Sequence, residues 1–184
     1  MAWSNVTLAD GSVVGLYVQS FAQECGPSSV ATVGRLHGRT LDISQARTTV
    51  GSVDHNKPPG GGGSHDWGKD WSYMTSLTQA LSQYGVRMAY TRKSLADAAY
   101  KTFCEGRTKK KPGILRVEWA DGSGHFVVTV GKNGAAGQTF IEILDPYYGY
   151  QRVPLATFPT YTAPKAGTAE IGNGTLDRFW SIET

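Results

Sequence analysis

The segment VQSFAQECGPSSVA, residues 18–31, places a cysteine directly before an apolar helical pattern. Val30 and Val33 follow at helical spacing, and Pro27 lies where the first turn of a helix tolerates a proline. Cys25 is therefore predicted to lie at a helix N-terminus. There the positive end of the helix dipole and the unpaired amides favour thiolate over thiol. The position suits a nucleophile, although a lone cysteine before an apolar helix is more often part of a core.

The composition predicts one globular domain spanning residues 1–184. Apolar and aromatic residues make up 40% of the 184 residues, which is enough for a hydrophobic core. The net charge of +3 is too small to indicate a nucleic-acid partner. The first residues, MAWSNVTLADGSVV, lack the pattern of a signal peptide, and no apolar run is long enough for a membrane span. Two cysteines without a CxxC motif indicate neither disulfides nor zinc, and favour a reducing compartment such as the cytoplasm.

Helical patterns precede strand patterns along the chain, and a Gly/Pro-rich loop over residues 51–70 interrupts the helices. Helices are predicted over residues 26–37, 40–51, 72–85 and 94–106. Short β-rich runs separated by turns are predicted over residues 113–119, 125–131, 138–145, 150–155 and 177–183. This order predicts an α+β domain in which an N-terminal helical half packs on a C-terminal antiparallel sheet. A cleft between the halves is the expected place for a site.

Two residues of the predicted sheet could complete a site around Cys25. His125 begins an apolar strand after a glycine-flanked turn, and Asp145 ends the next strand. Antiparallel pairing would bring these two residues together, so that the carboxylate orients the imidazole. Gln19, six positions before Cys25, could supply a side-chain amide to an oxyanion hole, together with the Cys25 backbone N–H.

These motifs resemble those of papain-like cysteine peptidases. The resemblance rests on Gln-x5-Cys-Gly at a helix start, a Gly-His-Phe-Val-Val strand and an Ile-Leu-Asp-Pro strand end, over residues 17–36 and 113–150. Because an acidic residue directly precedes Cys-Gly-Pro, the sequence is most similar to the bacterial peptidases that remove double-glycine leaders from bacteriocins. The resemblance implies Cys25 as nucleophile, His125 as general base and acid, Asp145 as its orienter and Gln19 as oxyanion donor. It implies no metal and no organic cofactor.

The predicted function is hydrolysis of a peptide bond in a protein or peptide substrate. Because the sequence carries no exporter, the hypothesis extends to a bacterial effector or toxin. Such an effector would leave the producer cell by a route that needs no signal peptide and would act on a cytosolic protein of a target cell. The producer cell would then need an immunity protein. Three alternatives stay open: a glutamine deamidase or acyltransferase with the same triad, a peptidoglycan amidase, and a catalytically silent module that binds leader peptides.

Several residues have competing interpretations. Gln23 is a second glutamine near the nucleophile, and Asp121 in the DGSG turn is a rival orienter for the imidazole. Cys104 is interpreted as a packing or surface residue, and His55 and His65 as loop histidines rather than metal ligands. Further assignments are Trp67, Trp71 and Tyr73 as loop anchors, Gly60–Gly63 as part of a loop, residues 107–112 as a solvated basic loop, and Tyr147 and Tyr148 as candidates for shaping the cleft.

Overall fold

The computed structural model describes residues 2–40, 42–55, 74–91, 97–135 and 137–183. Its helices are α1 (Cys25–Leu36), α2 (Ile43–His55), α3 (Met74–Gln83) and α4 (Asp97–Glu105). Its strands are β1 (Ala2–Thr7), β2 (Val13–Val18), β3 (Ala89–Thr91), β4 (Gly113–Trp119), β5 (Gly124–Ala135), β6 (Gln138–Asp145), β7 (Gly149–Pro154), β8 (Thr160–Pro164) and β9 (Ile171–Glu183).

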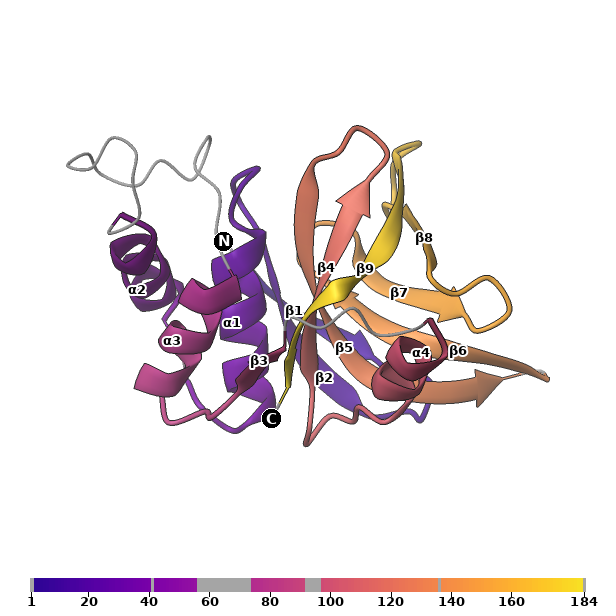
Figure 1. Ribbon diagram of the computed structural model, residues 1–184, viewed down its shortest axis with the longest axis horizontal. Coiled ribbons are helices and arrows are strands. Elements are labelled where there is room, and N and C mark those ends of the chain that lie inside the picture. The colour runs from indigo at the N-terminus through magenta and orange to yellow at the C-terminus, as the bar shows by residue number, and fades with distance from the viewer. Residues whose placement is uncertain (1, 41, 56–73, 92–96, 136, 184) are drawn as a thin grey trace.

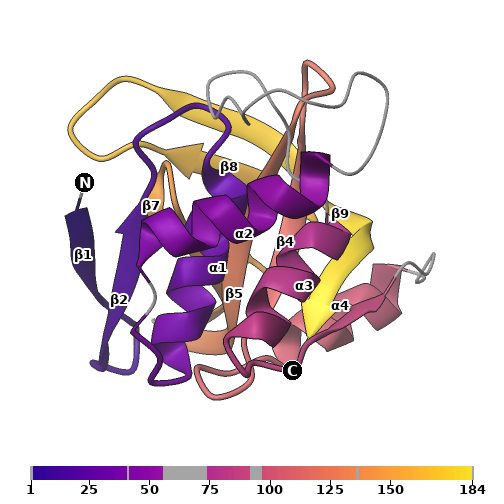
Figure 2. The same cartoon turned by 90° about the vertical axis from the view of Figure 1, so that its left-hand side faces the viewer.

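The strands after β2 form one antiparallel sheet in the order β3-β9-β4-β5-β6-β7, and β8 pairs with β9 beside this path. Helices α1, α2 and α3 gather on one side of this sheet (Figure 1). The turned view shows them in front of the strands (Figure 2). A separate hairpin of β1 and β2 pairs Ala2 with Val18 and Thr7 with Val13. The molecule is thus an α+β domain with a helical half packed on an antiparallel sheet.

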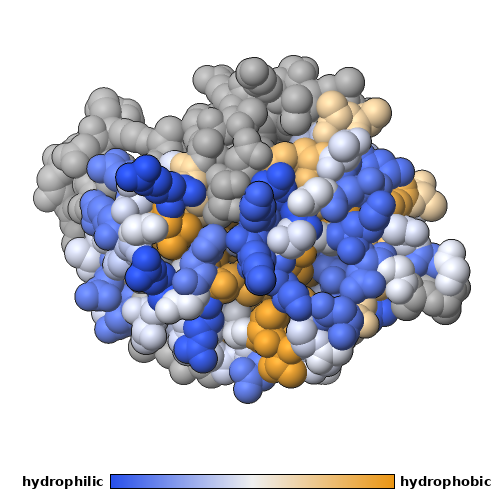
Figure 3. All heavy atoms as spheres, turned by 90° about the horizontal axis from the view of Figure 1, so that it is seen from below, coloured by the Kyte–Doolittle hydropathy of each residue, from blue (hydrophilic) through white to orange (hydrophobic). Residues whose placement is uncertain are grey.

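The alternation of side chains along the central strands creates two cores. Ile114 and Val128 face the core shared with α1, α2, α3 and the hairpin, whereas Leu115 and Val127 face a second core with α4 and β8. In β6, Leu144 belongs to the first core and its neighbour Ile143 to the second. Apolar side chains are few and scattered over the face shown in Figure 3, which is mostly hydrophilic. One sheet therefore separates and supports both cores.

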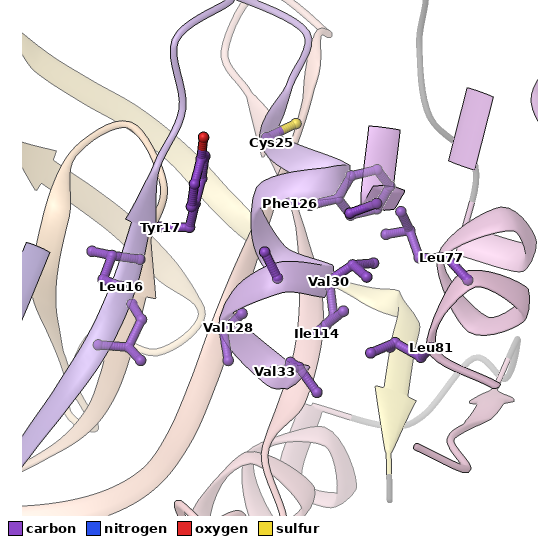
Figure 4. Packing of buried hydrophobic residues seen from close by; sticks show 14 of the residues in the cluster. Leu16, Tyr17, Cys25, Val30, Val33, Leu77, Leu81, Ile114, Phe126 and Val128 are labelled. Atoms are coloured by element: carbon purple, nitrogen blue, oxygen red, sulfur yellow. The ribbon is translucent and has the colours of Figure 1, made fainter. Parts of the chain in front are cut away.

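Helix α1 lies at the centre of the first core, and every residue from Cys25 to Gly34 is buried. Val30 and Val33 pack toward the sheet residues Ile114 and Val128 and toward the side chains of α3 (Figure 4). The helix ends before Gly38, whose positive φ of 71° lets the chain reverse so that Arg39 N donates to Gly34 O. Burial from Cys25 to Gly34 fixes α1, and with it Cys25, against the sheet.

The predicted fold class and the Cys25 helix are confirmed, and two local predictions are wrong. The loop is predicted to begin at residue 51, which is too early, because α2 continues to His55. No proline lies within α2 to end the helix sooner. Strand β9 begins at Ile171, before the predicted residue 177. Residues 56–70 of the predicted loop, with His65, Trp67, Trp71, Tyr73 and Gly60–Gly63, lie outside the described residues. Among the described helices, none has the length and apolar character needed to cross a membrane.

Candidate active site

Cys25 is the first residue of α1, as the sequence pattern predicts. Ser28 N donates to Glu24 O at 3.0 Å, so the first helical hydrogen bond closes directly around the cysteine. The residue is only 6% exposed, and its sulfur lies at the helix end, above the apolar side chains that pack along α1 (Figure 4). The helix therefore presents the sulfur at the positive end of its dipole.

The sheet brings His125 and Asp145 together. His125 is the second residue of β5 and pairs with Val117 of β4, while Asp145 ends the adjacent strand β6. The His125 Nε2 atom lies 2.8 Å from Asp145 Oδ1, and Cys25 is near enough to the imidazole to raise its pKa. Because Nε2 is engaged by the carboxylate, Nδ1 is the ring nitrogen left for the sulfur. The order Cys25, His125, Asp145 is that of a nucleophile, a base and an orienting carboxylate.

Asp145 is fully buried, and four donors surround its carboxylate. Oδ1 accepts hydrogen bonds from His125 and from the backbone N–H groups of Tyr147 at 2.7 Å and Tyr148 at 2.9 Å. Oδ2 accepts one from the Tyr161 hydroxyl at 2.6 Å. A buried carboxylate with this many donors is held both ionised and in a fixed orientation.

The charges of the buried pair support each other. Burial alone would lower the pKa of His125, but the charge and hydrogen bond of Asp145, and those of Cys25, raise it to about 10. Burial alone would raise the pKa of Asp145, but the charge of His125 and the hydrogen bonds from His125, Tyr161 and Tyr148 N hold it below its usual value. The imidazolium is thus favoured in the resting site.

Gln19 lies beside this group but holds its side chain within its own loop. Its backbone N–H donates to Pro146 O at 2.9 Å, so the residue is tied to the turn that follows Asp145. Its Nε2 donates to Phe21 O at 3.0 Å and to Ala22 O at 3.2 Å. Its Oε1 is buried and has no hydrogen-bond partner among the described residues. In this conformation the amide hydrogens point at loop carbonyls, so donation to an oxyanion needs one of these bonds to open.

Glu24, directly before Cys25, is completely buried and paired with Arg47 of α2. The carboxylate also accepts a hydrogen bond from Ser20 N at 2.6 Å, while the Arg47 guanidinium lies 5.1 Å from the centroid of the Phe21 ring. These contacts join the loop over residues 19–24 to both α1 and α2. Glu24 and Arg47 therefore hold the loop that carries Gln19.

An aromatic group covers the other side of the imidazole. The Trp119 ring stacks on His125 with centroids 5.5 Å apart, and it also contacts Tyr148 and Tyr161. Gly174 of β9 leaves the space for this ring, since an added Cβ would lie 2.7 Å from it and 2.6 Å from Glu118 O. The tryptophan excludes water from one face of His125.

The structure also places the competing candidates. Asp121 accepts hydrogen bonds from Ser123 N and Oγ and remains an exposed turn residue. Gln23 lies half-buried in the turn before α1. Cys104 is fully buried in the second core, so it is a packing residue and not a surface residue, and burial raises its pKa to about 12. Within the described part of the chain, no group of three or more His, Cys, Asp or Glu residues could hold a metal ion.

Trp119, Tyr161 and the Glu24–Arg47 pair were not predicted as parts of the site. Trp119 could have been found, because it ends β4 immediately before the turn that leads into His125, and antiparallel pairing places such residues together. Tyr161 gave no such signal. It reaches Asp145 from β8, which follows a run of turns and pairs with β9 outside the main path of the sheet.

Comparison with solved structures identifies this architecture. A double glycine motif protease from an AMS/PCAT transporter, crystallised with the leader peptide, is similar over 88% of this chain and 91% of its own, with a TM-score of 0.54 and 20% identity. The peptidase domain of Streptococcus ComA, a bifunctional ABC transporter of a quorum-sensing pathway, is similar over 91% of this chain and 94% of its own, with a TM-score of 0.57 and 16% identity. The fold is that of a papain-like cysteine peptidase.

Within the papain-like fold, the likeness to a double glycine motif protease agrees with the motifs in the sequence. No protein-family model matches the sequence, and no curated protein matches it at a significant level. The fold is therefore identified from similarity to solved structures, whereas the roles of the site residues have to be argued from the geometry of those residues.

Proposed function

We propose that the protein is a cysteine peptidase that cleaves a peptide bond with Cys25, His125 and Asp145. The observation that carries this proposal is the buried hydrogen bond between His125 and Asp145 next to Cys25, which lies at the N-terminus of a buried helix and raises the pKa of the His125 ring. The papain-like fold supports it, because both similar structures are peptidase domains. Each of the three side chains is held by a different element, so their meeting requires the complete fold.

In the proposed reaction, the Cys25 thiolate attacks the carbonyl carbon of the substrate and forms a tetrahedral intermediate. The Cys25 backbone N–H and the Gln19 amide donate to its oxyanion, after Gln19 releases one of its two loop carbonyls. The His125 imidazolium then protonates the leaving amine, and the neutral ring next takes a proton from the water that hydrolyses the acyl-enzyme. Asp145 keeps the ring oriented throughout. The sequence of steps needs no metal or organic cofactor.

The substrate class follows less directly. One of the similar proteases is described as acting on a double glycine motif and was crystallised with a leader peptide. We therefore propose an extended peptide segment as substrate, with peptides that end in Gly-Gly as the first to be tested.

Labelling of Cys25 tests the activity without knowledge of the substrate. The purified protein is treated briefly with a thiol-directed, peptide-like epoxide, and its intact mass is measured. We expect one adduct on Cys25 that is lost in both Cys25→Ala and His125→Ala. Adduct formation that persists in His125→Ala would contradict the proposal, because the thiol would then react without the imidazole. Labelling of Cys104 alone would favour the silent binding module.

The reaction type needs a second measurement. Mass spectrometry of a proteome treated with wild type and with Cys25→Ala separates chain scission from the one-dalton change of glutamine deamidation. Loss of turbidity of purified sacculi would identify a peptidoglycan amidase. We expect scission of a small set of proteins and no change in sacculi.

The effector hypothesis stays a prediction, and the growth of bacteria that express the protein tests it. If the protein is a toxin that acts on a cytosolic target, its expression in the cytosol of susceptible bacteria will stop growth, and expression of Cys25→Ala will not. Co-expression of a cognate immunity protein should restore growth. Equal growth of both strains, with equal protein levels, would contradict this part of the proposal.

A further inference from the structure

The two oxygens of Asp145 have separate partners. Oδ1 faces His125 and the two backbone N–H groups of the following turn, whereas Oδ2 has the Tyr161 hydroxyl at 2.6 Å. Both Asp145 and Tyr161 are completely buried, so water cannot replace this hydroxyl. Tyr161 belongs to β8, which lies outside the main path of the sheet and is held by β9.

We propose that Tyr161 is a positioning residue of the active site that acts through Asp145. Its hydroxyl donates to Oδ2, keeps the buried carboxylate ionised and fixes its plane so that Oδ1 stays aligned with His125 Nε2. The inference rests on the proposed function, because it assigns a role within the Cys25–His125–Asp145 site. It makes the strand β8, which the sequence pattern does not predict, a part of the catalytic machinery.

The groups around Asp145 make Tyr161 the residue that can hold its Oδ2 atom. Among the described residues, the titratable side chains that hydrogen-bond Asp145 are His125 from β5 and Tyr161 from β8, and Cys25 from α1 follows behind His125. Tyr148 of the following turn bonds Asp145 only through its backbone N–H. The only cation among them is the imidazolium on the Oδ1 side. Burial, followed by the charge of Asp145, raises the pKa of the Tyr161 hydroxyl well above its usual value. The hydroxyl therefore keeps its proton and acts as a donor.

Tyr148 provides a matched control in the same aromatic group. Its ring contacts Trp119 as the Tyr161 ring does, with centroid distances of 5.7 Å and 5.8 Å. However, its hydroxyl donates to Glu170 at 3.3 Å, and only its backbone N–H bonds to Asp145. Tyr161→Phe and Tyr148→Phe thus remove the same atom from two neighbouring rings, and only the first change reaches Oδ2.

The experiment measures the rate of Cys25 alkylation by iodoacetamide between pH 3 and pH 10, with the site assigned by peptide mass. A hydrogen bond to an ionised carboxylate lowers its pKa, so Tyr161→Phe should let Asp145 take a proton at higher pH and lose its support of the imidazolium. We expect the acid limb of the alkylation rate to move up by about one pH unit, with a tenfold lower rate below that limb. Tyr148→Phe should leave the limb unchanged.

Two further variants separate positioning from packing. In an Asp145→Asn background, Tyr161→Phe should cause no further shift, because the group through which it acts is already uncharged. A fluorinated tyrosine at position 161 is a stronger donor of nearly the same shape, so it should move the limb to lower pH. This second variant keeps the test valid even if Tyr161→Phe does not fold.

The outcomes distinguish the two proposals. If the wild-type thiol is alkylated like an ordinary cysteine, with its limb near pH 8.5, the proposed function itself is wrong. If the wild-type limb is low but neither Tyr161→Phe nor the fluorinated residue moves it, Tyr161 has only a structural role. Equal shifts in Tyr161→Phe and Tyr148→Phe would also overturn the inference.

Discussion

Under the proposed function, single side chains at this site hold hydrogen bonds that compete with their catalytic roles. Gln19 is the clearest case, because its Nε2 already donates to Phe21 O and Ala22 O. The loss of one such bond is offset when the amide turns to a developing oxyanion, whose charge makes it the stronger acceptor. The resting loop thus stores the donor close to where it is needed.

Replacement of Gln19 tests this role directly. Gln19→Ala should lower kcat for a cleaved peptide by about 10²–10³-fold with little change in KM, because the donor is used only in the transition state. Gln23→Ala, in the same loop, is the control and should keep near-normal kcat. A large loss in Gln23→Ala with none in Gln19→Ala would assign the oxyanion hole to the other glutamine.

The buried His125–Asp145 pair should make stability depend on pH. His125 has a raised pKa in the folded protein, so its contribution is complete below the unfolded value of about 6.5 and is lost as pH rises toward about 10. Asp145 has a lowered pKa, so its contribution is present above about pH 4 and is lost as pH falls through the folded value. We expect the urea midpoint of wild type to fall from pH 6.5 to pH 10, and this fall to be weaker in His125→Asn. If the urea midpoints of wild type and His125→Asn changed with pH in the same way, this expectation would be wrong.

The sequence predicts the residues that lie at ends of regular elements. Cys25 starts an apolar helix, and His125 and Asp145 lie near the joined ends of two strands, so their meeting follows from antiparallel pairing. Glu24 and Tyr161 could not be predicted in this way. Their partners lie on α2 and β6, and those contacts depend on how whole elements pack.

A buried ion pair between Glu24 and Arg47 holds the loop over residues 19–24 to helix α2. Glu24 is completely buried, and the Arg47 side chain is 17% exposed. Removal of one partner of such a pair leaves an uncompensated buried charge, whereas removal of both leaves none. The pair therefore fixes where the loop and α2 lie relative to each other.

Arg47→Met should reduce the free energy of unfolding by about 3–5 kcal/mol, and Glu24→Gln combined with Arg47→Met should recover a large part of this loss. Urea denaturation of the two single variants and the double variant measures the coupling. Lys132→Met is the control, because its pair with Glu105 is partly exposed and should contribute about 1 kcal/mol or less. Equal losses in Arg47→Met and Lys132→Met would show that the loop does not depend on the pair.

Elements with a strong periodic pattern are predicted well, and those defined by their neighbours are not. The helix at Cys25 and the central strands β4, β5 and β6 were predicted because burial imposes their periodicity. The hairpin of β1 and β2 and the strand β8 were missed. Each lies at the side of the fold, where partial exposure weakens the pattern and pairing with another strand decides the structure.

At the scale of the whole molecule, one sheet joins two cores that the active site spans. Cys25 belongs to the core shared by α1, α2 and α3, whereas Tyr161 belongs to the core on the other side. Adjacent residues of β6, Ile143 and Leu144, contribute to different cores. Loss of packing on one side should therefore loosen the strands that support the other. We expect the protein to unfold in a single cooperative transition.

Cys104 can report this cooperativity, because its thiol is completely buried in the second core. In a Cys25→Ala background, Leu81→Ala in the first core and Ile141→Ala in the second each remove a fully buried side chain, at a cost of about 2–5 kcal/mol. If the cores unfold together, Cys104 labelling and far-UV circular dichroism should follow one urea midpoint in each variant. If Leu81→Ala lowers the circular dichroism midpoint but leaves Cys104 labelling unchanged, the two cores unfold separately, and the site would lose Cys25 from His125 before the sheet itself opens.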